Sequence, residues 1–191
     1  MSLQIVSWKD FLENPVESAI TIGVFDGLHL GHRALIELIV RRGPNPTVIT
    51  FRDNPRKVIN PECFQGEIFT FEQKLAGFEK LNVRRVVLID FSEEFSKMRG
   101  RLFVDLLQDP GKMVYLAIGS NFRCGYGKDI GADSIKEVNE GKGIPTDIVP
   151  PVVLFDKPVS SSLIRSAIHR GDLKLAALLM GRDIENEKTG E

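Results

Sequence analysis

Short apolar runs alternate with segments of helical spacing along almost the whole chain, and this alternation constrains the fold more than any other feature. The expected strands cover residues 19–25, 47–51, 85–91, 112–119 and 148–155. Helical spacing is found at residues 30–42 and 70–82, around 103–107 and 135–138, and over 160–180 with a break near Gly171. Two stretches rich in Pro, Gly or Asn, 53–66 and 121–131, predict irregular loops. The alternation predicts an α/β fold with a mostly parallel sheet flanked by helices.

The composition excludes several classes of partner. Lys and Arg total 25 against 26 Asp and Glu, so the net charge of −1 provides no basic surface for nucleic acid or an anionic membrane. The two cysteines, Cys63 and Cys124, are far apart and form no CxxC pair, which predicts reduced thiols. The N-terminus does not resemble a signal peptide, and no apolar run approaches the ~20 residues of a membrane helix. We therefore expect a cytoplasmic protein with neither nucleic-acid nor membrane partners.

The joint after the first expected strand combines glycines with two histidines. It reads Gly23-Val24-Phe25-Asp26-Gly27-Leu28-His29-Leu30-Gly31-His32, which is neither a Rossmann GxGxxG nor a Walker loop. His29 and His32 share one face at a helix start, where anions are favoured, and Gly31 between them allows a bulky ligand to approach closely. Two imidazoles in this place suit phosphate oxygens. The alternatives are a zinc pair, which His169 alone could extend with a third histidine, and simple capping of the helix.

A second candidate phosphate site covers residues 160–165. The run Ser160-Ser161-Ser162 predicts a helix N-cap, which leaves backbone amides and hydroxyls open to a ligand. Arg165 follows about one turn later, and its planar guanidinium suits bidentate contact with phosphate oxygens. Capping and phosphate binding are compatible interpretations of this segment.

These segments resemble the motifs of one known family, the bacterial FAD synthases of the HxGH nucleotidyltransferase superfamily. The first joint resembles the family's GxFDGxHxGH signature, and residues 50–58 resemble TFxPHPxxV. Residues 119–125 resemble GxDFRFG, residues 159–165 resemble ISSTxIR, and residues 179–182 resemble LLGR. The order and spacing of the motifs agree over residues 19–182. The resemblance implies a Rossmann-like nucleotidyltransferase fold.

The family resemblance also implies an activity and roles for individual residues. The expected reaction transfers the adenylyl group of ATP to FMN, giving FAD and pyrophosphate, with Mg²⁺ as the cofactor. The catalytic residues would be His29, His32 and Arg165. The ATP site would comprise Gly23, Phe25, Asp26, Gly27, His29, Gly31, His32, Gly119, Ser160, Ser162 and Arg165. The FMN site would comprise Phe51, Asn54, Asn121, Phe122 and Arg123, and Asn121 would also be a metal ligand.

The sequence departs from the family motifs at three places. Asp53-Asn54 replaces Pro-His, Asn121 replaces Asp, and Cys124 replaces an aromatic residue. We expect residues 1–182 to form the adenylyltransferase domain and residues 183–191 to form a polar tail, with the family's riboflavin kinase domain absent. Such a chain would make FAD from FMN but would not make FMN from riboflavin. Two rival hypotheses are the same chemistry on another phosphorylated acceptor, and a non-catalytic protein that binds flavin or nucleotide.

Overall fold

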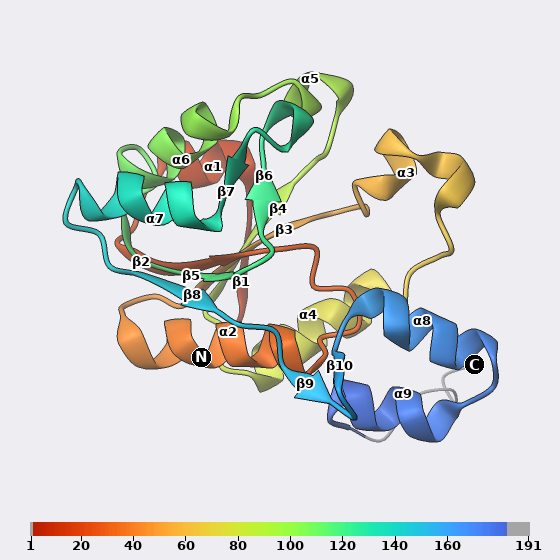
Figure 1. The fold of residues 1–191 in the computed structure, drawn as a ribbon. Coiled ribbons are helices and arrows are strands. Elements are labelled where there is room, and N and C mark those ends of the chain that lie inside the picture. The colour runs from red at the N-terminus through yellow and green to blue at the C-terminus, as the bar shows by residue number, and fades with distance from the viewer. Residues whose placement is uncertain (1, 183–191) are drawn as a thin grey trace.

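A six-stranded sheet forms the centre of the computed structural model, which describes residues 2–182 (Figure 1). The predicted tail, residues 183–191, lies outside the described residues. The strand order is β1-β4-β3-β2-β5-β8. The strands are β1 (Gln4–Ser7), β2 (Ser18–Ile22), β3 (Thr47–Phe51), β4 (Arg85–Ile89), β5 (Met113–Gly119) and β8 (Thr146–Val149). Every pairing in this sheet is parallel, which confirms the predicted fold class.

Helices cover both faces of the sheet, which explains why its strands are almost continuously apolar. On one face lie α1 (Trp8–Glu13), α6 (Gly100–Gln108) and α7 (Ala132–Glu140), and on the other lie α2 (Leu30–Arg42) and α4 (Phe71–Lys80) (Figure 1). The first layer buries Phe11, Phe103 and Ile135, and the second buries Ile36, Ile39 and Phe78. A capping box formed by Thr70 and Gln73 is present at the start of α4.

Two further helices pack beside the second layer. They are α8 (Ser161–His169) and α9 (Leu173–Met180), and they separate at Gly171, whose φ of +75° ends α8 as the sequence predicted. Ile164 and Leu179 are fully buried in the same core cluster as the side chains of α2 and α4. This packing holds the N-terminus of α8 near the start of α2. None of the helices within residues 2–182 has the length and apolar character needed to span a bilayer.

Several element boundaries differ from the sequence prediction. The first strand ends at Ile22 rather than at residue 25, and the last ends at Val149, because Pro150 and Pro151 cannot continue a ladder of backbone hydrogen bonds. The residues beyond form a separate antiparallel hairpin of β9 (Val153–Leu154) and β10 (Lys157–Pro158).

The two predicted loops contain short elements. Residues 53–66 include α3 (Arg56–Ile59) and the 3₁₀ turn η1 (Pro61–Cys63). Residues 121–131 include the paired strands β6 (Arg123–Cys124) and β7 (Ile130–Gly131), with η2 (Tyr126–Lys128) between them. The elements β1, α1 and α5 (Glu93–Ser96) were not predicted.

Candidate functional site

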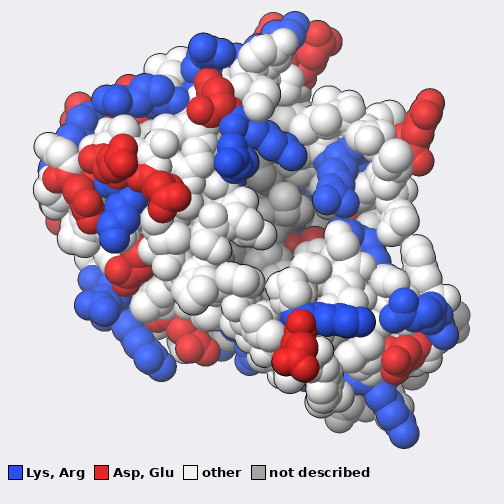
Figure 2. All heavy atoms as spheres, viewed as in Figure 1, with Lys and Arg blue, Asp and Glu red and all other residues white. Residues whose placement is uncertain are grey.

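The strand order predicts a ligand site at the carboxyl ends of two central strands. From β2 the chain proceeds to β3 and β4 on one side, whereas β5 and β8 lie on the other, so β2 and β5 flank the switch point. Ligands of open α/β sheets bind beyond the carboxyl ends of strands at such a point. A cavity of about 430 Å³ lies there, and Figure 2 shows the molecule hollowed on this face, with basic side chains on the rim.

Five segments that are distant in sequence line this cavity. They are the joint after β2, the start of α3, the end of β5, the residues after β8, and the start of α8. Of the predicted site residues, the lining includes Gly23, Phe25, Asp26, His29, Gly31, His32, Asn54, Gly119, Asn121, Phe122, Ser160, Ser162 and Arg165. The structure therefore brings the ATP and FMN residues proposed from the motifs largely into one place.

The joint after β2 is a tight turn with several residues in the left-handed region. Phe25 has φ +54° and is fully buried, and Gly27 has φ +83°. This turn directs His29 into the N-cap position of α2. A Cβ on Gly31 would lie 3.3 Å from ring atoms of His29, so Gly31 makes room for that imidazole. Gly31 also lines the cavity, so the close approach of a ligand at Gly31 stays a prediction.

His29 and His32 form a stacked pair. Their ring centroids are 3.6 Å apart with an interplanar angle of 16°. The backbone N–H of His32 donates to Nδ1 of His29 at 3.3 Å, which caps α2 and leaves the proton of a neutral His29 on Nε2. The capping interpretation of His29 is thus confirmed. Both rings line the cavity, so capping and ligand binding are compatible.

Burial keeps both imidazoles uncharged near neutral pH. Desolvation lowers the pKa of His29 to about 4, against a smaller opposing effect of the Asp26 carboxylate. Desolvation lowers the pKa of His32 well below its usual value, and a charge on His29 would lower it further. The pair therefore presents neutral N–H donors at the positive end of the α2 dipole. A zinc interpretation has no support, because residues 2–182 hold no group of three potential His, Cys, Asp or Glu ligands.

The serine run at the start of α8 serves partly as structure. Oγ of Ser160 accepts from the backbone N–H of Leu163 at 3.2 Å, which confirms the predicted N-cap. Oγ of Ser161 donates to the backbone carbonyl of Asp26 at 2.8 Å and so ties α8 to the joint after β2. Ser162 is exposed and lines the cavity. The N-terminus of a nine-residue helix, with its outward N–H groups, thus opens on the same cavity as that of α2.

Arg165 lines the cavity from the first turns of α8, but it is also part of a buried ion pair. Its side chain is buried, and one terminal nitrogen lies 2.9 Å from Oδ2 of Asp26. Its Nε donates to the backbone carbonyl of Gly66 at 3.1 Å. Two of the five guanidinium N–H groups have these partners, and three remain for a ligand.

Three predicted residues do not line the cavity. Gly27 faces Ile68, whose side chain lies 3.1 Å from the position of an added Cβ. Phe51 packs edge-on against Phe91, with ring centroids 5.6 Å apart. Arg123 lies in β6 and pairs with Gly131.

Other lining residues were not predicted. They include Arg56 at the start of α3 and the run of residues 149–152. Residues 149–152 lie at and beyond the carboxyl end of β8, which is where ligands of parallel sheets bind. They were missed because the sequence analysis extended this strand to residue 155.

The residues around the cavity offer little to a metal ion by themselves. Asn121 provides an exposed amide oxygen beside Gly119, but no acidic cluster is present among residues 2–182. Mg²⁺ in nucleotide sites is commonly held by substrate phosphates and water with few protein ligands. The donor set therefore fits a Mg²⁺ ion that enters with a nucleotide rather than one in a protein cage.

Solved structures resemble this fold. A crystal structure described as a macrolide-efflux protein from Streptococcus pneumoniae matches with a TM-score of 0.79 at 24% identity, covering 95% of this chain and 62% of that one. A pantoate-β-alanine ligase from Francisella tularensis matches with a TM-score of 0.56 at 16% identity, covering 94% of this chain and 85% of that one. At these identities the likeness concerns the fold alone, and it agrees with the parallel α/β arrangement expected from the sequence.

Curated relatives share more of the sequence. The bifunctional riboflavin kinase/FMN adenylyltransferase of Bacillus subtilis (strain 168) is 29% identical over 176 residues, which are 89% of this chain and 55% of that protein. The protein of the same description from Pseudomonas fluorescens is 30% identical over 168 residues, which are 85% of this chain and 53% of that protein. The chain thus spans about half the length of the curated relatives it matches.

A family model described as FAD synthetase matches residues 12–163. This range contains the joint after β2, the start of α3, the end of β5 and the serine run of α8. All of the cavity's lining residues except Arg165 fall within it. A match that extends over most of the chain and nearly the whole cavity establishes the relationship: the chain belongs to the FAD synthetase family.

Proposed function

We propose that this chain transfers the adenylyl group of ATP to FMN, giving FAD and pyrophosphate. The observation that carries the proposal is the neutral, stacked pair of His29 and His32 at the N-terminus of α2, in one cavity with the N-terminus of α8. Two helix N-termini and several N–H donors around one space suit a polyphosphate. The family relationship supports ATP and FMN as the substrates.

The reaction needs positioning more than acid–base catalysis. A phosphate oxygen of FMN attacks the α-phosphorus of ATP, and the bond from that phosphorus to the oxygen bridging to the β-phosphate breaks. The electron pair leaves with pyrophosphate. The attacking phosphate is already ionised at neutral pH, so no strong general base is required. The protein's contribution is alignment and stabilisation of the charge that develops on the phosphates.

In this reaction His29 and His32 donate N–H hydrogen bonds to the α- and β-phosphates. Because both imidazoles are neutral in the free protein, they can be buried without placing an unpaired charge in the interior. Ser162, Arg165 and the first N–H groups of α8 hold the phosphates that leave. Gly23 and Gly119, at the ends of β2 and β5, permit close approach of the nucleotide to the backbone.

The flavin side of the cavity lies toward α3 and the turn after β5. Phe122 and Asn121 form one wall, and Asn54 forms another. Asn54 is buried and accepts from the backbone N–H of Arg56 at 3.1 Å, so the residue that replaces the family's histidine supports the start of α3. Arg56, next to Asn54 in this wall, places a positive charge beside the proposed FMN site. Phe51 and Arg123 do not line the cavity, so they would contact FMN only if the ligand extended beyond it.

Mg²⁺ completes the proposed site as a companion of ATP, with the amide oxygen of Asn121 as the protein ligand. When bound, it neutralises charge on the phosphates and favours departure of pyrophosphate. Substrates of this kind, together with two thiols that pair with no partner, also support a cytoplasmic location.

The test is to incubate the purified chain with FMN, ATP and Mg²⁺ and to separate flavins by chromatography. FAD should appear together with an equal amount of pyrophosphate. His32→Ala should abolish most of this activity, whereas His169→Ala, at an exposed histidine outside the cavity, is the matched control and should retain it. Release of pyrophosphate with another acceptor, such as a pantetheine, nicotinate or glycerol phosphate, but not with FMN would establish the rival substrate class. Binding of FMN and ATP without turnover would instead indicate a non-catalytic protein.

A further inference from the structure

One carboxylate joins three parts of the chain that are far apart in sequence. Asp26 is only 5% exposed, and its Oδ1 accepts from the backbone N–H groups of Ile68 at 2.8 Å and Phe69 at 3.2 Å. Its Oδ2 accepts from Arg165 at 2.9 Å, a residue 139 positions away. Its backbone carbonyl accepts from Ser161. We call Asp26, Arg165 and the segment 65–69 that they hold the Asp26 clasp.

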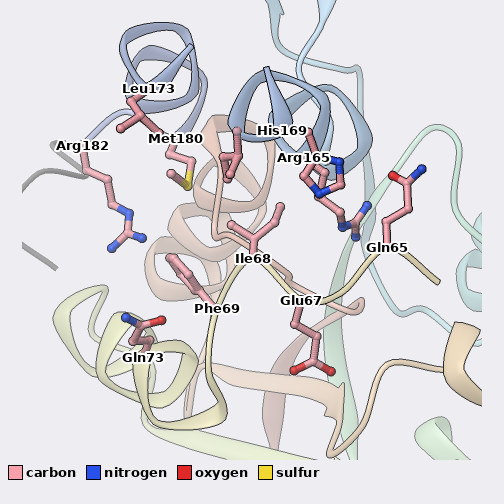
Figure 3. A pocket seen from close by; sticks show the side chains of 11 residues that line it. Gln65, Glu67, Ile68, Phe69, Gln73, Arg165, His169, Leu173, Met180 and Arg182 are labelled. Carbon is pink, nitrogen blue, oxygen red and sulfur yellow. The ribbon is translucent and has the colours of Figure 1, made fainter. Parts of the chain in front are cut away.

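Segment 65–69 has no helical or strand hydrogen bonds of its own. Asp26 binds two of the segment's N–H groups, and the carbonyl of Gly66 accepts from Nε of Arg165. Phe69 also packs in the core, and Glu67 forms an ion pair with Lys57 at 3.2 Å. Figure 3 shows Arg165 on α8 approaching the segment that carries Gln65 and Glu67. The clasp also forms part of the wall between the main cavity and a second cavity of about 200 Å³, and Arg165 lines both.

The resemblance to FAD synthases assigned Asp26 to the ATP site. A carboxylate there would repel phosphates if it faced them. The structure instead places both of its oxygens on protein donors, and one of these donors is the arginine that faces the cavity. A guanidinium that a buried partner already fixes loses less rotamer freedom on binding a phosphate, so Asp26 can influence nucleotide binding through Arg165.

We propose that Asp26 is a positioning residue whose carboxylate holds the Arg165 guanidinium, together with segment 65–69, in the orientation that binds the ATP phosphates. The proposal rests on the proposed function for the identity of the nucleotide. It predicts that removing the charge of Asp26 weakens ATP binding only as long as Arg165 is present. A direct contact of Asp26 with ATP would weaken binding in either background.

The test is a double-mutant cycle on ATP affinity, measured by titration calorimetry with ATP and Mg²⁺. The variants are Asp26→Asn, Arg165→Met and the two combined. Asparagine can still accept from Ile68 and Phe69, but its NH₂ group opposes the donors of Arg165. We expect Asp26→Asn to raise the Kd for ATP about tenfold, and to change it by less than about twofold when Arg165→Met is already present. Asp133→Asn, at an exposed carboxylate in the first turn of α7, is the matched control and should bind ATP normally.

Two outcomes overturn the proposal. One is an equal loss of affinity from Asp26→Asn in both backgrounds, which would mean a direct contact or a general loosening of the site. The other is no loss in either background. If Asp26→Asn does not fold, Asp26→Glu replaces it in the same cycle, since the longer acid keeps the charge but displaces the guanidinium. FAD formation by the unmodified chain is measured alongside, so failure of the proposed reaction is distinguishable from failure of the clasp.

Discussion

Replacing His29 with asparagine should make the protein less sensitive to acid. The change His29→Asn removes a titrating ring but keeps an oxygen that can accept from the backbone N–H of His32, so the cap of α2 is retained. In the native protein burial lowers the pKa of His29 to about 4, whereas the unfolded chain has the ordinary value of 6.5. Between these two values the unfolded state binds more protons than the folded state, so stability falls as the pH falls.

The magnitude follows from the two pKa values. Relative to pH 7, the free energy of unfolding should lose about 2 kcal/mol at pH 5 and about 3 kcal/mol at pH 4 through His29 alone, and then level off. His32, whose pKa is also lowered, contributes in the same direction but is present in both proteins. The difference between wild type and His29→Asn therefore measures the contribution of His29 together with its effect on the pKa of His32.

The assay is urea unfolding of both proteins at pH 8, 7, 5 and 4. Between pH 8 and 7 the difference in unfolding free energy should be constant, which is the internal control. From pH 7 to pH 5 the wild type should lose about 2 kcal/mol more than the variant. Parallel pH profiles for the two proteins would refute the inference that His29 is buried in its neutral form.

Three further substitutions test the site and the fold. His32→Ala should lower kcat by about 10²–10³-fold with little change in FMN affinity, because one donor at the developing charge is lost; near-full turnover would make His32 structural. Arg165→Lys should raise the KM for ATP and slow turnover in steady-state assays, because lysine lacks the forked donors; an equal loss of FMN binding would mean that α8 has loosened. Thr70→Ala should lower the unfolding free energy by about 1 kcal/mol in urea denaturation by removing the capping box of α4, and no measurable change would contradict that assignment.

The parts of the fold that could be predicted are those with a strong local cause. Strands buried on both faces require nearly unbroken apolar runs, so the central strands were recognisable. The capping box before α4 and the glycine after α8 are short-range signals of a helix start and a helix end. The placement of His29 and His32 at the start of α2 followed from the same kind of pattern.

The features that were missed depend on contacts distant in sequence. Strand β1 has an exposed Ile5 and only four residues, and it is held by its parallel pairing with β4, some eighty positions later. No pattern in the sequence near β1 indicates that β4 is its partner. The pairing of Asp26 with Arg165 is equally non-local, so no local pattern in the sequence predicted it. The strand predicted over residues 148–155 was too long, because the two prolines after Val149 end it.

The most direct test of the central claim follows the phosphorus atoms of ATP. The chain is incubated with FMN, Mg²⁺ and ATP labelled with ³²P either at the α-phosphate or at the γ-phosphate. Attack on the α-phosphorus predicts that the α label appears in FAD and the γ label in pyrophosphate, with none of the γ label in flavin. Absence of the α label from FAD, or appearance of the γ label in a flavin product, would contradict adenylyl transfer at this site.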